Sequence, residues 1–342
     1  MGIVAVQKVE EGSKNAKEKV YKAVKIAMEK AKWKKFIHKG EDTLLKVNMC
    51  WADFLLPGMC TSPWVLGATI ETIQNYVGRI YVGEGMAAAF QSWKRGCKVN
   101  KWDKVAKEYG VELLDLAKDK YIQVKVKGVP FKITLSKFAV EVPNFITMPL
   151  MKTHSVTIFT GALKNQFGVT FGKRILYHLH LPETIVGVNE IVKPNFAVMD
   201  GTIGMEGNGP ANGIPKVMDL ILASGDLPGL DATACRIMGI DPKEVEYIML
   251  AVKRGLGSFN PKIIGEKIDN VKQKFKRAGP QAYYEYGMFP LLKSRFKDFV
   301  YNYLWIPGRF GVKILRDFWY LREGRKYKNK ILVTSRYASQ WL

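Results

Sequence analysis

The first 260 residues alternate short apolar runs with amphipathic stretches, and this alternation limits the folds open to the chain. The strand-like runs read IVAVQKV, TLLKVNM, RIYVGEG, VELLDL, NFITMPL and NFAVMDG. Helical patterns occupy 13–33, 62–77, 226–240 and 242–257. Strands that alternate with helices are typical of an α/β protein. We therefore predict a mostly parallel sheet with helices on both faces.

Helix starts and turns add detail to this prediction. Ser13 and Ser62 precede helical patterns and are predicted N-caps, with Pro63 in the first helical position. The segment 121–135 predicts a hairpin. The run NFAVMDG predicts a strand that ends at Asp200, and the glycine-rich residues that follow predict a long loop.

The basic residues gather at the two ends of the chain. The net charge is +22, of which residues 1–40 contribute +7 and residues 271–342 contribute +12. Within 271–342, aromatic residues and leucines mix with Lys and Arg at helical spacing. We predict an α/β core over 1–270 and a basic, aromatic-rich helical C-terminal extension over 271–342. The extension either packs on the core or on a second copy in a homo-oligomer, or lies on an anionic membrane surface.

The remaining composition argues against several classes of protein. The cysteines, Cys50, Cys60, Cys97 and Cys235, form no CxxC pair, so neither a zinc ribbon nor an iron–sulfur motif is predicted. No GxGxxG or Walker sequence is present. The charge lies at the ends and no nucleic-acid motif accompanies it, which argues against nucleic acid as partner. No signal peptide or membrane span is evident, so we expect a cytoplasmic protein, with peripheral membrane contact as the alternative.

Three of the four histidines lie within residues 154–180, close to a lysine. The segment MKTHSVTIFTGALKNQFG carries His154 and Lys164, and ILYHLH carries His178 and His180. Histidine ligates metals and transfers protons, and a desolvated lysine can form covalent bonds. We predict catalytic roles for His154 and Lys164 and metal ligation by His180 and His154. The alternative is a hydrogen-bonded loop histidine and a solvated helix lysine.

Polar residues at other strand exits extend the candidate site. Lys152, Gly161, Lys164, Thr61 and Ser62 lie at predicted helix starts or strand ends, which suits a bound anion or cofactor. Asp200 and Glu206 follow a strand and are candidates to orient a histidine, bind a cation or accept protons. The alternative roles are helix capping for Thr61 and Ser62 and ordinary turn carboxylates for the two acids. Asp226 and Asp231 flank another helix start, where capping by Asp226 is favoured.

Several blocks, in order along the chain, resemble a known family. MPLMKTHSVTIFTGALKNQFGV, VMDGTIGMEGNGPANGIP and LILASGDLPGLDATACRIMGIDP look like the signature blocks of the domain of unknown function 362 family. LKVNMCW, TSPWVLGATI and IYVGEG are similar to its N-terminal blocks. This resemblance covers roughly residues 1–260. The family's activity is not settled, so the resemblance implies a fold but no reaction.

A more distant similarity concerns the nickel-pincer lactate racemase family. His154, Gly161, Lys164 and His180 reproduce its H-x9-K spacing and a further histidine sixteen residues on. The resemblance implies that Lys164 tethers a pincer cofactor, His180 ligates nickel and His154 acts as acid/base. Thr61-Ser62-Pro63 resembles that family's Thr-Arg-Pro loop, with Ser62 where the arginine stands.

Taken together, the residues and the resemblances predict an enzyme that acts on a small anionic substrate. Redox or racemase-like chemistry is the favoured reaction class, with a transition metal (nickel or iron) or a lysine-tethered pincer as cofactor. The alternative function is a non-catalytic binding or peripheral membrane protein that uses its basic aromatic C-terminal extension.

Overall fold

The structure is a computed structural model, and it describes residues 2–85, 91–279, 299, 303–304 and 306–342. Its main sheet has the strand order β13-β1-β12-β11-β7-β2-β3-β4, with β8 paired to β11 and β9 paired to β8. The strands are β1 (Ile3–Lys8), β2 (Thr43–Lys46), β3 (Ile80–Glu84), β4 (Glu112–Asp115), β7 (Asn144–Thr147), β8 (Leu150–His154), β9 (Ile158–Thr160), β11 (Phe196–Asn208), β12 (Asn212–Ser224) and β13 (Lys262–Gly265). Most neighbouring pairs are parallel, and the pairs made by β12 and β9 are antiparallel.

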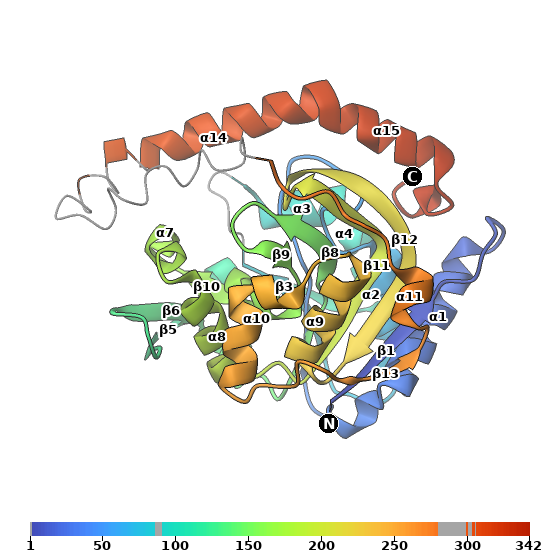
Figure 1. Ribbon diagram of the computed structural model, residues 1–342, viewed down its shortest axis with the longest axis horizontal. Helices are drawn as coiled ribbons and strands as arrows, with labels where there is room; N and C mark the ends of the chain where they lie inside the picture. Colours follow the sequence, from blue (N-terminus) through green and yellow to red (C-terminus); the bar gives the residue numbers. More distant parts are fainter. Residues whose placement is uncertain (1, 86–90, 280–298, 300–302, 305) are drawn as a thin grey trace.

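Helices cover both faces of this sheet, which confirms the predicted α/β fold (Figure 1). Successive strand residues point to opposite faces, so Leu44 and Leu45, for example, belong to separate cores. One core is built by α1 (Ala16–Lys30), α2 (Pro63–Ile73), α3 (Trp93–Val99) and α4 (Trp102–Tyr109). The other is built by α6 (Ala162–Asn165), α8 (Leu181–Val192), α9 (Leu227–Ile237) and α10 (Glu246–Lys253).

A small antiparallel sheet flanks the second core. It contains β5 (Tyr121–Lys125), β6 (Lys132–Ser136) and β10 (Thr170–Phe171), so the predicted hairpin over 121–135 is confirmed. Short helices complete the body of the molecule: α5 (Lys137–Glu141), α7 (Arg174–His178) and α11 (Ile268–Val271).

Two local predictions were wrong. The strand that was expected to end at Asp200 continues to Asn208, and it pairs with β12 as a long hairpin in place of the expected glycine-rich loop. Glycine suits this strand because a Cβ on Gly204 would lie 2.8 Å from the Met151 carbonyl oxygen. Helix α1 begins later than expected, with Asn15 and not Ser13 at its N-cap. The N-cap prediction for Ser62 is confirmed, since its hydroxyl accepts from the Val65 amide.

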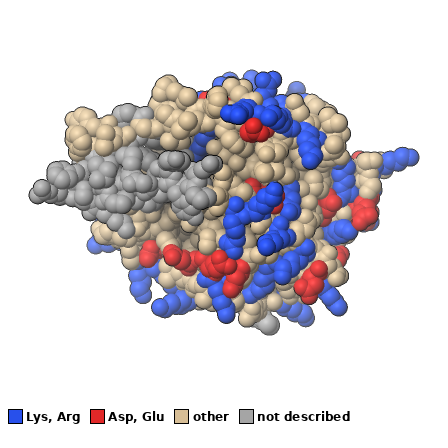
Figure 2. Space-filling model, turned by 45° about the horizontal axis from the view of Figure 1, so that its top comes forward, with Lys and Arg blue, Asp and Glu red and all other residues tan. Residues whose placement is uncertain are grey.

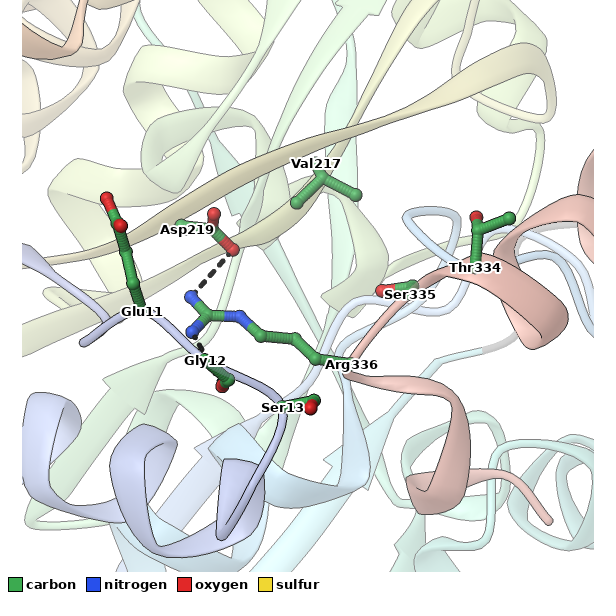
Figure 3. A pocket seen from close by; sticks show the side chains of 8 residues that line it. All are labelled: Glu11, Gly12, Ser13, Val217, Asp219, Thr334, Ser335 and Arg336. Atoms are coloured by element: carbon green, nitrogen blue, oxygen red, sulfur yellow. Dashed lines mark hydrogen bonds and ion pairs between the residues drawn. The ribbon is translucent and has the colours of Figure 1, made fainter.

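The C-terminal extension forms α14 (Ile306–Trp319), a π-helical turn at Tyr320–Gly324 and α15 (Arg325–Thr334) (Figure 1). Its end is fixed to the core by Tyr337, which is fully buried and donates a 2.6 Å hydrogen bond to Asp219 on β12. Arg336 forms an ion pair with the same carboxylate (Figure 3). The shallow pocket around this contact is lined by 11–13, 217, 219 and 334–336, which include none of the predicted site residues. The division into a core over 1–270 and an extension over 271–342 stays a prediction.

The Tyr337 anchor predicts that the extension contributes to global stability. Tyr337→Ala should lower the free energy of unfolding by about 3–5 kcal/mol, as large buried aromatic side chains do when they are truncated. Val333→Ala is the matched control, because Val333 is 84% exposed on α15 and its loss should change stability by less than about 0.5 kcal/mol. Urea unfolding of both variants measures the difference. Equal, small effects would show that the anchor contributes nothing.

Candidate active site

A buried ion pair forms the floor of the candidate site. Lys46, the last residue of β2, and Glu84, the last residue of β3, are 2.7 Å apart and almost completely buried. Burial lowers the pKa of Lys46 and raises the pKa of Glu84, and the attraction between the two charges opposes both effects. The backbone amides of Met49 and Gly85 donate to the same carboxylate. The pair therefore joins the carboxyl ends of two neighbouring parallel strands.

Asn165, on the short helix α6, fastens this floor to the rest of the site. Its side-chain oxygen accepts from Lys46 Nζ at 3.1 Å and from Asn48 Nδ2 at 2.9 Å. Its side-chain nitrogen donates to the Lys46 carbonyl oxygen and to the Thr147 hydroxyl. Every strong hydrogen-bonding position of this amide is used, which fixes the orientation of α6.

Lys152 is a second fully buried lysine in the site. It lies on β8 and donates to Asn48 Oδ1 at 2.6 Å and to the Met59 carbonyl oxygen at 2.9 Å. Both acceptors are neutral, so no carboxylate among its hydrogen-bond partners compensates its charge. Across the antiparallel β8–β9 pair, Lys152 faces Thr160, whose buried hydroxyl has no hydrogen-bond partner within the described residues.

Lys164 is the least compensated lysine of the group. It is half-buried on α6, and its Nζ lies 5.8 Å from the centre of the Phe167 ring. Burial lowers the pKa of Lys164 to about 8, the Cys50 side chain opposes this shift, and the charges of Lys152 and Arg174 add to it. Such a lysine is partly unprotonated near neutral pH, which makes its amine a nucleophile.

His154 ends β8 beside these cations. Its Nδ1 accepts hydrogen bonds from the Val156 amide at 3.0 Å and the Thr157 amide at 3.4 Å, so the neutral ring carries its proton on Nε2. Burial is the main cause that holds the pKa of His154 well below its usual range, followed by the charges of Lys164, His178, Lys152 and Arg316. His154 is therefore a neutral imidazole at physiological pH.

The two remaining histidines of the cluster occupy different surroundings. His178 packs edge-on against Phe167 at 4.9 Å, and the charge of Lys164 contributes, after burial, to a pKa of about 4. His180 precedes α8 and packs edge-on against Phe131 at 5.9 Å, beside the small sheet. His178 thus shares the electrostatic environment of Lys164 and His154. No group of three His, Cys, Asp or Glu side chains in the described part of the chain is placed to hold a metal ion, and metal ligation by His180 and His154 stays a prediction.

Gly161 and Asp231 set the start of α6. The Asp231 carboxylate accepts from the Ala162 and Leu163 amides at 2.6 and 3.0 Å, and burial raises its pKa to about 7. A Cβ on Gly161 would lie 2.2 Å from that carboxylate, so glycine is required by the close approach. The helix start that was predicted to hold an anion is therefore bound by the protein's own carboxylate.

Thr61, Ser62 and Asp200 form a structural link between α2 and β11. The Thr61 hydroxyl accepts from the Asn48 amide and donates to the Met148 carbonyl oxygen. Asp200 accepts from the Ser62 amide at 2.9 Å and from Thr202, and burial raises its pKa. In the structure these groups hold the loop that carries Asn48, and their predicted cofactor and catalytic roles stay predictions.

Glu206 lies on the long hairpin. It forms a 3.0 Å ion pair with Lys216 and accepts from the Lys276 amide, so it ties the hairpin to the segment that precedes α14. Asp226 caps α9 by accepting from the Gly229 amide, as expected.

Sequence reasoning missed Lys46, Glu84, Asn165 and Arg316. Lys46 interrupts the apolar run TLLKVNM, and a lysine in a strand that is buried on both faces is a signal that could have been used. Arg316 lies in a tail rich in basic residues, where nothing in the pattern distinguishes it.

The group as a whole can bind an anion and supply a nucleophile beside a neutral imidazole. The charges of Lys152, Lys164 and Arg174 act on one another or on His154 and His178, while the nearby Glu84 carboxylate is engaged by Lys46. Lysines with no carboxylate among their hydrogen-bond partners, as Lys152 and Lys164 are within the described residues, favour a negatively charged ligand.

Comparisons with known proteins find a similar curated protein and similar solved structures. The chain is 24% identical over 284 residues to Thylakoid-associated protein sll1697 of Synechocystis sp., which covers 80% of this chain and 87% of that protein. Among solved structures, the lactate racemase apoprotein from Thermoanaerobacterium thermosaccharolyticum is similar at 12% identity with a TM-score of 0.47. That match covers 70% of this chain and 58% of the racemase chain, so this chain spans little more than half of the racemase's length.

A family model covers more than half of the chain. The family described as Domain of unknown function (DUF362) matches residues 43–236, a range that contains β2, β3, β8, α6 and α8. All of the site residues described above except Arg316 lie within that range. The chain belongs to the DUF362 family.

Proposed function

We propose that this protein is an enzyme that binds a small anionic substrate at the Lys152–Lys164–His154 cluster and uses Lys164 as its reactive group. One observation carries the proposal: Lys164 is half-buried among other cations and has no hydrogen bond or ion pair within the described residues. A lysine kept in this state without a partner costs stability, which is typical of functional sites.

The neighbouring groups suit this role. His154, with Nδ1 engaged by backbone amides, can donate from Nε2 or take part in proton transfer there. The unpartnered Thr160 hydroxyl and the Lys152 ammonium offer further donors beside it. The arrangement supports acid–base chemistry at a substrate held by its negative group, of which racemase-like or redox chemistry is the reaction class we favour.

The residues also fit a covalently held cofactor in part. A lysine with a lowered pKa, such as Lys164, is suited to form a covalent link to an organic cofactor. The charge of Lys164 acts on both His154 and His178, so these two imidazoles are the ones that could hold a metal beside such a cofactor. When bound, a transition metal would supply hydride or Lewis-acid chemistry.

A second candidate function is peripheral membrane association, and the exposed face of the extension favours it. Phe310, Ile314, Phe318 and Leu321 recur at helical spacing and are each more than half exposed. Exposed basic residues follow at once on the same helical run: Arg322, Arg325, Lys326 and Lys330. Figure 2 shows many Lys and Arg side chains on the face that it turns forward, with areas of uncharged residues between them. No helix in the described ranges is long and apolar enough to span a bilayer, and the relative's name, thylakoid-associated, is consistent with surface attachment.

The lowered pKa of Lys164 predicts selective reaction with aldehydes. At pH 7, Lys164 should be labelled by 4-carboxybenzaldehyde with cyanoborohydride roughly 100-fold faster than the exposed Lys107, because about a tenth of its amine is unprotonated, against far less than 1% for an ordinary lysine. The labelling rate should reach half its maximum near pH 8. Peptide mass spectrometry measures both sites, and equal labelling of Lys164 and Lys107 would contradict the proposal.

The same shift predicts that Lys164 destabilises the fold. Its pKa is lower in the folded than in the unfolded chain, so the cost is complete below pH 8 and disappears as the pH rises past about 10.4. Lys164→Met should therefore stabilise the protein at pH 7 by up to about 3 kcal/mol, since tenfold in protonation equals about 1.4 kcal/mol. The gain should fade between pH 8 and 10. Lys107→Met is the control. A loss of stability in Lys164→Met at pH 7 would contradict the prediction that Lys164 destabilises the fold.

The apolar stripe of α14 predicts binding to anionic vesicles. The wild-type chain should co-sediment with vesicles that contain phosphatidylglycerol and not with pure phosphatidylcholine, and Ile314→Glu/Phe318→Glu should reduce binding at least tenfold. Val333→Glu is the control, because Val333 is exposed but lies outside the stripe. Unchanged vesicle binding by the double variant would show that the stripe is not the membrane contact. If the wild type instead forms dimers and the double variant does not, the stripe would be assigned to self-association.

A further inference from the structure

Helix α14 lies against the loop that surrounds the candidate site. Its Lys313 forms a 3.2 Å ion pair with Asp53, and Tyr320, just after the helix, stacks on Phe54 at 4.1 Å. The Tyr320 hydroxyl also donates to the Leu55 carbonyl oxygen at 2.9 Å. These contacts fix both the position of the helix and its rotation about its own axis.

Arg316 lies on the same inward face, because positions 313, 316 and 320 follow one another along one side of the helix. Its guanidinium carbon lies 5.1 Å from the centre of the Trp51 ring. Trp51 is 4% exposed, and its indole N–H has no acceptor within the described residues. A buried N–H donor without an acceptor, beside a guanidinium, suits the oxygens of an anion.

Trp51 belongs to the loop between β2 and α2, which contacts the site lysines. Asn48 and Met59 in this loop accept from Lys152, and the Cys50 side chain, next to Trp51, acts electrostatically on Lys164. The charge of Arg316 is also among those that act on His154. Arg316 thus reaches the site from the C-terminal extension, beyond the residues that the family match covers.

We propose that Arg316 and the indole N–H of Trp51 form one wall of the ligand site and bind the carboxylate or phosphate group of the substrate. The C-terminal extension is then part of the site, and it supplies an anion-binding residue that the 43–236 domain lacks. A guanidinium offers two parallel N–H donors to either anion, which an ammonium cannot do. This proposal rests on the proposed function, since it assigns the recognition of the substrate whose reactive partner is Lys164.

Reductive labelling of Lys164 in the full-length protein tests the assignment. The probes are 4-carboxybenzaldehyde, 4-formylphenyl phosphate and the neutral methyl 4-formylbenzoate. In each case the amine adds to the aldehyde carbon, the oxygen leaves as water, and cyanoborohydride delivers hydride to the resulting iminium carbon. The wild type should prefer the anionic probes over the neutral ester by tenfold or more, as expected for charged hydrogen bonds. The probe preferred between carboxylate and phosphate identifies the class of anion.

In Arg316→Gln, the ratio of the labelling rates of the anionic probes to that of the neutral ester should fall to about one, while labelling by the neutral ester continues. Arg316→Lys should keep only part of the wild-type ratio. Trp51→Phe keeps the ring under the guanidinium, removes the N–H donor and should lower the preference severalfold. Arg322→Gln, at an exposed arginine on the next turn, is the control and should leave it unchanged. A full preference in Arg316→Gln, with an unchanged thermal midpoint, overturns this inference alone. Absence of Lys164 labelling by all three probes in the wild type overturns the proposed function as well.

Discussion

The Lys46–Glu84 ion pair is the constraint on which the candidate site depends. Burying two charges costs free energy that is offset only when the geometry is good and the remaining donors and acceptors are satisfied. Here Asn165, two backbone amides and a backbone carbonyl oxygen complete the set. The pair also excludes any side chain on Gly168, whose Cβ would lie 2.2 Å from Glu84. Strands β2 and β3 and the segment after α6 are therefore held in one arrangement.

This constraint explains where Lys164 points. Asn165 is turned toward the floor by its hydrogen bonds, and successive residues on a helix project about 100° apart, so the preceding Lys164 projects in a different direction. The floor contains Lys46, which is paired with a carboxylate, whereas Lys152 and Lys164 have no carboxylate among their hydrogen-bond partners within the described residues. This contrast matters for function, because the Lys46 ammonium is engaged by a carboxylate, whereas Lys164 lies among like charges, with a pKa lowered to about 8, and can attract an anion.

The sequence predicted the sheet and its helices because strand and helix periods are local properties. It also predicted that His154, Lys152 and Lys164 lie together, since they are neighbours along one strand–helix exit. Lys46, Glu84 and Asn165 were missed because their association depends on strand order, which joins β2 to β3 and β7 across long stretches of chain. The glycine-rich segment after Asp200 was assigned to a loop because glycine usually marks turns, whereas here it permits close packing of a long strand.

The extension has two faces with different chemistry, and one set of contacts determines both. Because Lys313–Asp53 and Tyr320–Phe54 fix the rotation of α14, Arg316 is directed toward Trp51 and, on the far side, Phe318 and Leu321 are directed outward. A helix that rotated to cover its apolar stripe would withdraw Arg316 from the loop. Contact of the stripe with an anionic surface, by contrast, keeps the present rotation and with it the guanidinium beside Trp51. Under the two proposals, attachment at a membrane and anion binding in the site thus stabilise the same position of α14, so each should strengthen the other by thermodynamic linkage.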